Sequence, residues 1–164
     1  MDQHDRLIWQ MTAYEENCPQ RIQHFLKVTS FAELIGRREN LDDKTYRILR
    51  TAAVVHDIGI RPSLEKFGSA AGEYQQIEGP PVAERLLHSL GYKASEIERV
   101  CYLIAHHHTY HDIDGLDYQI LVEADFLVNI FEHDLKDDAR TSIRDSIFCT
   151  AGGLHLFDTL YPRS

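Results

Sequence analysis

Apolar residues recur at spacings of three and four along nearly the whole chain, and this helical period restricts the fold more than any other feature. The clearest stretch runs from Pro19 to Arg38. One face of that stretch carries Ile22, Phe25, Leu26, Thr29 and Ala32. Nowhere do apolar and polar residues alternate over several strand-length segments. The sequence therefore predicts an all-α protein, folded as a helical bundle.

Start and stop signals divide the remaining chain into further helices. We expect helices over residues 7–16, 42–57, 80–91, 95–107 and 116–132, then a last helix weakened by Gly152-Gly153. The segments 61–72 and 110–115 are predicted to be loops, because both are polar and contain glycine. Three of the helix starts rest on capping residues or prolines: Asp42 or Asp43, Pro80-Pro81, and Ser95 with Glu98 as a capping box.

Composition excludes several classes of function. The 164 residues carry a formal net charge of −9, so most of the surface should repel duplex nucleic acid. No apolar run approaches the roughly 20 residues of a membrane span, and the polar N-terminus is unlike a secretory signal. Three widely spaced cysteines fit neither a disulfide framework nor a zinc site, which favours the cytoplasm. We expect one domain over residues 1–164, with a motif core at about 19–131 and C-terminal helices at 134–161.

Four residues of metal-ligand type lie inside or at the end of apolar helical segments. His24 lies on the apolar face of residues 22–26, His56 and Asp57 end the run of residues 52–55, and Asp125 interrupts residues 120–128. A buried carboxylate without a partner is costly, so a cation or strong hydrogen bonds are expected around it. Two imidazoles and two carboxylates suit Mn, Fe, Co, Ni or Zn and leave positions open for water and substrate.

The order His24, His56-Asp57, Asp125 resembles the HD superfamily of metal-dependent phosphohydrolases, over roughly residues 19–131. Further motifs carry the resemblance: residues 21–28, His56-Asp57-Ile58-Gly59, residues 79–91, Ile104 to His108, and Glu123 to Leu127. It implies a helical bundle around a divalent transition metal held by the four residues. It also implies hydrolysis of a small phosphorylated molecule, often a nucleotide. Arg21, one turn before His24, and Lys66 are the expected phosphate-binding residues.

The chain departs from the family pattern at two positions. Where members with two or three ions carry an additional histidine, this sequence has Gln75 or Glu78. We therefore favour one ion and regard His106 and His107 as candidates either for a second ion or for substrate phosphate. Some nucleotidases place a glutamate three residues after the signature aspartate, where this chain has Ile60. Glu78 or Glu73 is then the candidate general base, unless Asp57 acts alone with the metal-activated water.

Each of these residues also has a simpler interpretation, and the whole chain has alternative functions. A lone buried histidine is more often a hydrogen-bonded core residue than a ligand, and Arg21 or Glu78 alone suits a solvated surface. His108 is expected on the surface or behind the ligands. The rival functions are a non-catalytic metal- and nucleotide-binding module and a diiron oxygenase. The chain is expected to be a monomer or a homodimer.

Overall fold

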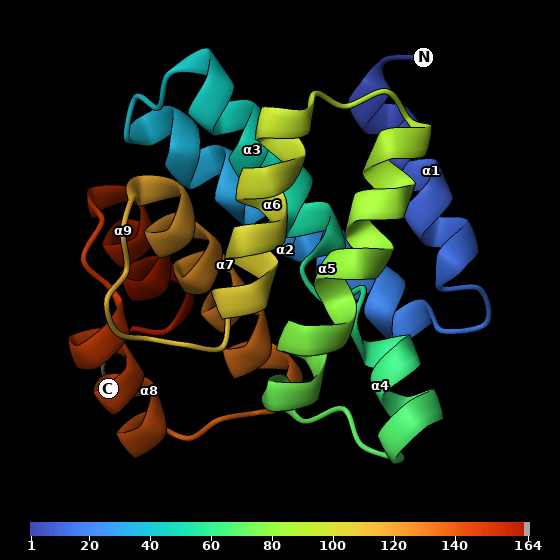
Figure 1. Ribbon diagram of the computed structural model, residues 1–164. Helices are drawn as coiled ribbons and strands as arrows, with labels where there is room; N and C mark the ends of the chain where they lie inside the picture. Colours follow the sequence, from blue (N-terminus) through green and yellow to red (C-terminus); the bar gives the residue numbers. More distant parts are fainter. Residues whose placement is uncertain (163–164) are drawn as a thin grey trace.

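The computed structural model describes residues 1–162, which form nine α-helices and no strand (Figure 1). The helices are α1 (Gln3–Tyr14), α2 (Pro19–Arg38), α3 (Asp43–Val55), α4 (Ile60–Phe67), α5 (Gly72–Ser89), α6 (Ala94–His106), α7 (Leu116–Glu132), α8 (Asp137–Ile147) and α9 (Ala151–Leu160). The all-α prediction is confirmed, and α2 and α7 have the predicted bounds.

Helices α2, α3, α6 and α7 surround the core, and α5 packs against α6 on the outside. Helix α7 is apolar on nearly all sides, and Leu121, Ala124 and Ile130 are completely buried. Burying one such side chain contributes roughly 1.5–3 kcal/mol for a leucine or isoleucine. Because α7 is surrounded on its sides, the polar groups that it carries inward must find partners inside the bundle.

Two predictions for the middle of the chain are wrong. Residues 61–72 are not one loop, because α4 occupies Ile60–Phe67 and ends at Gly68 with a left-handed φ of 65°. Pro62 lies in the first turn of α4. Backbone N–H groups in a first turn have no partner within the helix, so a proline, which lacks the N–H, is tolerated there. Nor do Pro80 and Pro81 open a helix, since both lie inside α5. Interior prolines cost about 3 kcal/mol or more, so packing against α4 and α6 must offset that cost.

Smaller corrections concern the helix ends. Helix α1 begins four residues earlier than expected because the Asp2 side chain accepts a hydrogen bond from the Asp5 N–H at 2.8 Å. Asp42 caps α3 as expected, but that helix ends at Val55, before the His-Asp pair. The predicted capping box at α6 is absent, since its N-cap, Lys93, makes no side-chain cap. The predicted last helix is in fact two, α8 and α9.

A contact between two backbones fixes the corner that follows α3. A Cβ atom on Gly59 would lie 2.6 Å from the Gln75 carbonyl oxygen and 2.9 Å from the Gly79 nitrogen, both in α5. On the other side, the Tyr14 hydroxyl of α1 donates to the Ile58 carbonyl at 3.0 Å. The corner that carries His56 and Asp57 is therefore held between α1 and α5.

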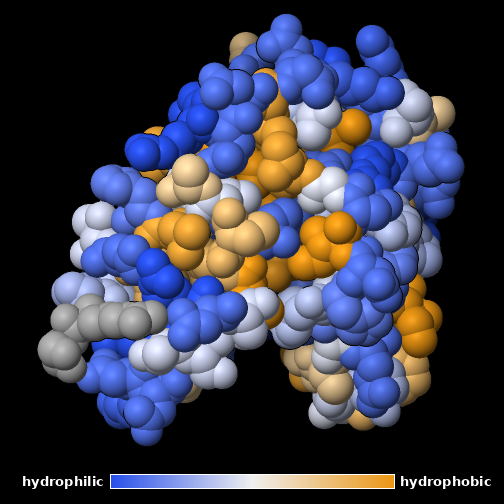
Figure 2. Space-filling model, turned by 90° about the vertical axis from the view of Figure 1, so that its left-hand side faces the viewer, coloured by the Kyte–Doolittle hydropathy of each residue, from blue (hydrophilic) through white to orange (hydrophobic). Residues whose placement is uncertain are grey.

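The surface is mostly hydrophilic, as expected for a chain with 26% charged residues. Figure 2 shows an apolar area in the middle of one face, with hydrophilic groups around it and a notch in the lower edge. Among helices α1 to α9, none combines the length and the apolar content that crossing a lipid bilayer requires.

Candidate metal centre

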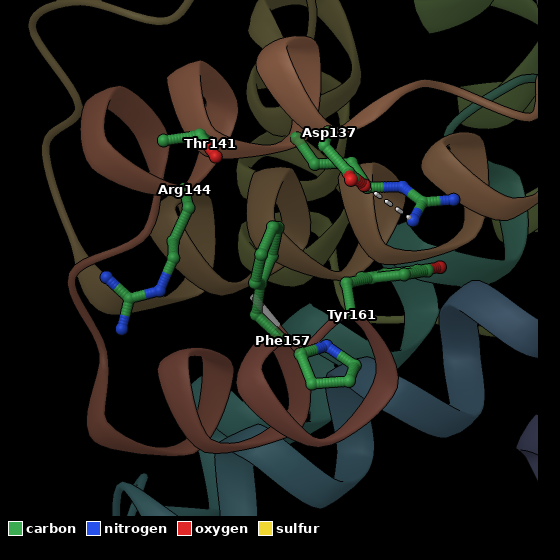
Figure 3. Close-up of a pocket in the computed structure, with 7 residues that line it drawn as sticks. Asp137, Thr141, Arg144, Phe157 and Tyr161 are labelled. Carbon is green, nitrogen blue, oxygen red and sulfur yellow. Dashed lines mark hydrogen bonds and ion pairs between the residues drawn. The ribbon is translucent and has the colours of Figure 1, made fainter. Parts of the chain in front are cut away.

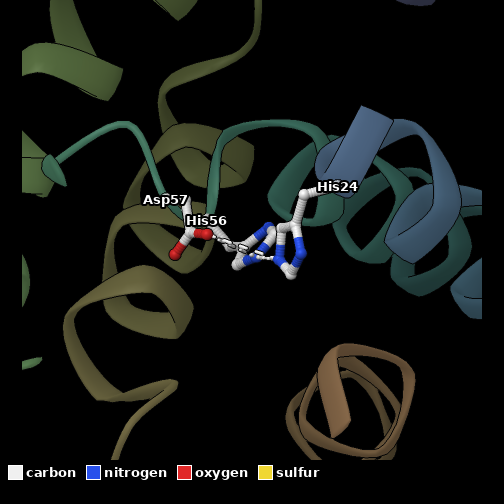
Figure 4. A group of neighbouring side chains, drawn as sticks. All are labelled: His24, His56 and Asp57. Carbon is white, nitrogen blue, oxygen red and sulfur yellow. Dashed lines mark hydrogen bonds and ion pairs between the residues drawn. The ribbon is translucent and has the colours of Figure 1, made fainter. Parts of the chain in front are cut away.

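The four predicted ligands come together at the centre of the bundle. His24 points inward from the second turn of α2, His56 and Asp57 follow the last turn of α3, and Asp125 lies in α7. The residues that lead into the pair, 52–55, are all completely buried, so α3 ends deep inside the molecule. Figure 4 shows the imidazoles of His24 and His56 facing each other, with the Asp57 carboxylate beside them.

Distances between the four side chains match the spacing of ligands around one ion. The Nε2 atom of His24 lies 3.1 Å from Nε2 of His56 and 3.1 Å from Oδ1 of Asp125. Oδ2 of Asp57 lies 3.4 Å from both imidazole Nε2 atoms. Donor atoms that bind one ion through bonds of about 2.1 Å are about 3.0–3.4 Å apart. The donor set therefore fits a transition metal in both chemistry and spacing.

Hydrogen bonds behind the two histidines leave their Nε2 atoms free to bind an ion. Nδ1 of His56 lies 2.8 Å from the Ala53 carbonyl oxygen, which can only accept, so Nδ1 carries the proton. Nδ1 of His24 lies 2.8 Å from Oε2 of Glu132. A histidine that donates from one nitrogen presents a lone pair on the other, which is the arrangement found at metal ligands. The sequence analysis did not identify Glu132.

Charges in the centre favour a bound cation. Burial alone would raise the pKa of Asp57, but the charge of His56 and the contacts of its carboxylate with the His107 and His56 imidazoles hold that pKa well below its ordinary value. Burial alone would lower the pKa of His56, but the charge of Asp57 and a hydrogen bond to Asp125 hold it well above 6.5. Without metal the carboxylates thus retain their negative charge and the imidazoles attract protons, so a divalent ion can replace those protons.

A second group of donors lies on the other side of Asp57. Its Oδ1 atom is 3.4 Å from Nε2 of His107, and His108 completes a set whose donor atoms lie within 4.8 Å of one another. Nδ1 of His107 donates to the Ile104 carbonyl at 2.8 Å, which leaves a lone pair on Nε2. That Nε2 atom is buried and has no hydrogen-bond partner. A buried, unsatisfied acceptor that faces a carboxylate fits a cation between them.

The histidines grouped with Asp57 are therefore His107 and His108, whereas the expected pair was His106 and His107. His106 instead directs Nδ1 to the Tyr102 carbonyl at 2.7 Å and stacks on the Tyr102 ring. Burial and the nearby His107 lower the pKa of His108 to about 4, so its imidazole is neutral at pH 7, as a ligand must be. The sequence suggested that His108 lies on the surface or behind the ligands.

Gln75, one of the two residues considered for the position of the additional histidine, lies beside the second group. Its side chain is buried, donates through Nε2 to the Ala70 carbonyl at 2.7 Å, and places Oε1 3.4 Å from Nε2 of His108. An amide oxygen at this position supplies a neutral acceptor in place of a third imidazole.

The other predicted site residues form two ion pairs. Nε of Arg21 lies 2.6 Å from Oε2 of Glu15, a buried carboxylate at the end of α1. Nζ of Lys66 lies 2.6 Å from Oε2 of Glu78, so the structure brings two of the predicted catalytic residues together across α4 and α5. The Lys66 side chain is 60% exposed and remains accessible to a ligand. Roles in phosphate binding or proton transfer remain predictions for Arg21, Lys66 and Glu78.

A cavity of about 210 Å³ between α8 and α9 lies apart from these groups (Figure 3). Its arginines are already in ion pairs, Arg144 with Asp158 and Arg140 with Asp137. None of the residues that line it was predicted for the site.

Stability should depend on pH in opposite ways without and with metal. The raised pKa values of His24 and His56 mean that their contribution to folding is complete below 6.5 and is lost as pH rises through the folded-state values. Asp57, whose pKa is lowered, loses its contribution only as pH falls below 3.8. The metal-free protein should therefore become less stable as pH rises above 6.5, while the stabilisation by added Mn²⁺ increases, because fewer protons compete. Thermal unfolding with and without Mn²⁺ measures both, and a metal-induced change in Tm that does not vary with pH would contradict this expectation.

Comparisons with known proteins agree with this geometry. The profile of the HD domain family matches residues 21–151, most of the chain. A crystal structure of a predicted HD superfamily hydrolase from an uncultured Thermotogales bacterium superposes with a TM-score of 0.68 and 22% identity, over 96% of this chain and 84% of that one, which supports the fold.

An uncharacterised protein of Clostridium beijerinckii is 32% identical over 81 residues. The match covers 49% of this chain and only about half, 48%, of that protein. The family profile covers far more of the chain than this relative does, and the His-Asp corner lies within it. The chain therefore belongs to the HD domain family.

Proposed function

We propose that the protein is a phosphohydrolase that uses divalent metal to hydrolyse a small phosphorylated molecule, in particular a nucleotide or a related phosphate ester. The observation that carries the proposal is the position of Asp57. One of its oxygens faces His24 and His56, and the other faces the unpartnered Nε2 of His107. A carboxylate with donors on both sides is suited to holding ions that act on one substrate group.

The donor sets on the two sides of Asp57 support two ions. His24, His56, Asp57 and Asp125 would hold the first, and Asp57, His107 and His108 the second. Bound metal of this kind acidifies a water and polarises a phosphoryl oxygen. Because the six donors are four imidazoles and two carboxylates, the metals that suit the site are Mn, Fe, Co, Ni and Zn.

The other candidate residues have separate proposed tasks. Glu78, which is 13% exposed and held by Lys66, is the candidate acceptor of a proton from the attacking water. Lys66 can exchange its carboxylate partner for a substrate phosphate, because its ammonium group lies at the surface. Arg21 would have to release Glu15 to do the same, so it ranks below Lys66 as a phosphate ligand.

The experiment is metal analysis of wild type and a His107→Ala variant, together with turnover of phosphomonoesters and nucleotides in Mn²⁺. We expect about two equivalents in wild type, about one in His107→Ala, and a large loss of turnover with the second ion. His88→Ala, at an exposed position on α5, is the control and should match wild type. One equivalent in both proteins would contradict the second site.

Tight nucleotide binding without turnover, with metal present, would instead favour a binding module. A protein that takes up no metal after reconstitution would overturn the proposed function altogether.

A further inference from the structure

We propose that Glu132 and Lys27 act together as a positioning pair for His24, and that the pair strengthens metal binding although neither residue binds the ion itself. The proposal rests on the proposed function, because it assumes that His24 binds metal. Oε2 of Glu132 lies 2.8 Å from Nδ1 of His24, and Oε1 of the same carboxylate lies 2.7 Å from Nζ of Lys27. Each carboxylate oxygen thus has one partner.

The geometry at His24 leaves one assignment for its protons when an ion is bound. Nε2 faces His56 and Asp125 at 3.1 Å, so it supplies the lone pair. Nδ1 must then carry the proton and donate to Glu132. A carboxylate behind a metal-bound imidazole fixes the ring orientation and makes the imidazole a stronger donor.

Helix α7 supplies both the ligand and its supports from one face. Asp125, Asn129 and Glu132 follow one another at spacings of four and three residues, so they share a side of the helix. The Asn129 amide donates to Oδ1 of Asp125 at 2.9 Å, while Glu132 reaches across to α2. One helical stripe therefore orients two ligands that come from different helices.

Lys27 fixes the orientation of the Glu132 carboxylate. It lies three residues after His24 on α2, so both side chains project toward the same part of α7. With Lys27 on one oxygen, the other is directed at the imidazole. Without it, Glu132 at the end of α7 would turn toward water, since its side chain is 25% exposed.

The pair lies at the rim of the bundle, so it can be changed without disturbing the core. Lys27 and Glu132 line an open groove of about 510 Å³ together with Pro19, Gln20, Gln23 and His133. Neither residue belongs to the apolar core.

The test compares Glu132→Ala, Glu132→Gln and Lys27→Met with a matched control, Glu33→Gln. Glu33 is also a carboxylate with two arginines and a histidine around it, and it lies on α2, but it faces Arg37, Arg50 and His4 away from the centre. We expect the Co²⁺ dissociation constant, measured by competition with a chelator, to rise about 10- to 100-fold in Glu132→Ala. The rise should be smaller in Glu132→Gln, which keeps an acceptor, and in Lys27→Met. Glu33→Gln should bind like wild type.

A spectroscopic measurement distinguishes a loss of His24 positioning from a general loss of stability of the fold. In the Co²⁺-loaded protein, the Nδ1 proton of His24 should give a paramagnetically shifted NMR signal that is protected from exchange by Glu132. We expect that signal to be lost through exchange with water in Glu132→Ala and to remain in Glu33→Gln. If Glu132→Ala does not fold, Glu132→Gln and Lys27→Met carry the test.

The outcomes separate this proposal from the proposed function. If metal affinity and the shifted NMR signal are unchanged in all three variants, the proposed positioning role is overturned and the proposed hydrolase function is unaffected. Failure of wild type to bind Co²⁺ would overturn both.

Discussion

Replacing Asp57 with alanine is expected to remove bound metal from both donor sets and to lower turnover at least about a thousand-fold. Its two oxygens lie 3.4 Å from His24 and His56 on one side and 3.4 Å from His107 on the other, so the variant takes a ligand from each ion. Metal assistance contributes several kcal/mol to such a reaction, and about 1.4 kcal/mol corresponds to a factor of ten. Metal analysis and steady-state kinetics of the same preparation measure the two effects.

Asp43→Ala is the matched control, because this aspartate lies on the same helix, α3, but at its exposed start. It should keep both metal and turnover. Thermal unfolding of metal-free Asp57→Ala should show a folded protein, since the Asp57 side chain is 21% exposed and outside the apolar core. An Asp57→Ala protein with full metal and full turnover would refute the assignment of this residue.

Replacing Glu123 with alanine is expected to lower the free energy of unfolding by about 3–5 kcal/mol without changing metal affinity. Glu123 is completely buried and accepts hydrogen bonds from the backbone of Cys149 and Thr150, the Thr150 hydroxyl and the Gln119 amide. Truncation leaves the backbone N–H groups of Cys149 and Thr150 without this acceptor at the start of α9, while the Gln119 amide keeps the Ile147 carbonyl. For a domain of this size the loss corresponds to a fall in Tm of about 10 °C, measured by calorimetry.

Glu98→Ala, an exposed glutamate on α6, is the control and should change stability by less than about 0.5 kcal/mol. Glu123→Gln should fall between the two, because the amide keeps one acceptor oxygen. A Tm for Glu123→Ala within 2 °C of wild type, a margin of roughly 1 kcal/mol, would show that α9 does not depend on this carboxylate.

The sequence could predict residues whose chemistry conflicts with their surroundings. His24 and Asp125 stand out because each interrupts an apolar helical face, and the structure brings both to the centre. The residues around Glu132 in the sequence show no such conflict. This glutamate ends a helix next to a histidine and an aspartate, so it resembles any solvated residue, and its role depends on how α7 crosses α2.

Local patterns also failed where tertiary packing outweighs helix propensity. Pro80 and Pro81 suggested a helix start, yet they lie within α5, whose contacts with α6 compensate for two missing donors. The sequence did not predict α4, and so it did not predict the ion pair between Lys66 and Glu78. That helix places Lys66 against Glu78, a pair that no sequence spacing indicates. His108 was likewise not predicted as a ligand, because its neighbours in space, Gln75 and Asp57, come from other segments.

The contact between Gly59 and Gly79 has a mechanical consequence. Since no side chain separates the two backbones, nothing between them can deform to absorb a movement. Any displacement of α5 relative to α3 is transmitted directly to the chain two residues from the Asp57 carboxylate. A change of the backbone between His56 and Gly59 would therefore displace a bound ion as well. In a relative with this backbone contact, a new substrate would have to be accommodated by different side chains at the edge of the site.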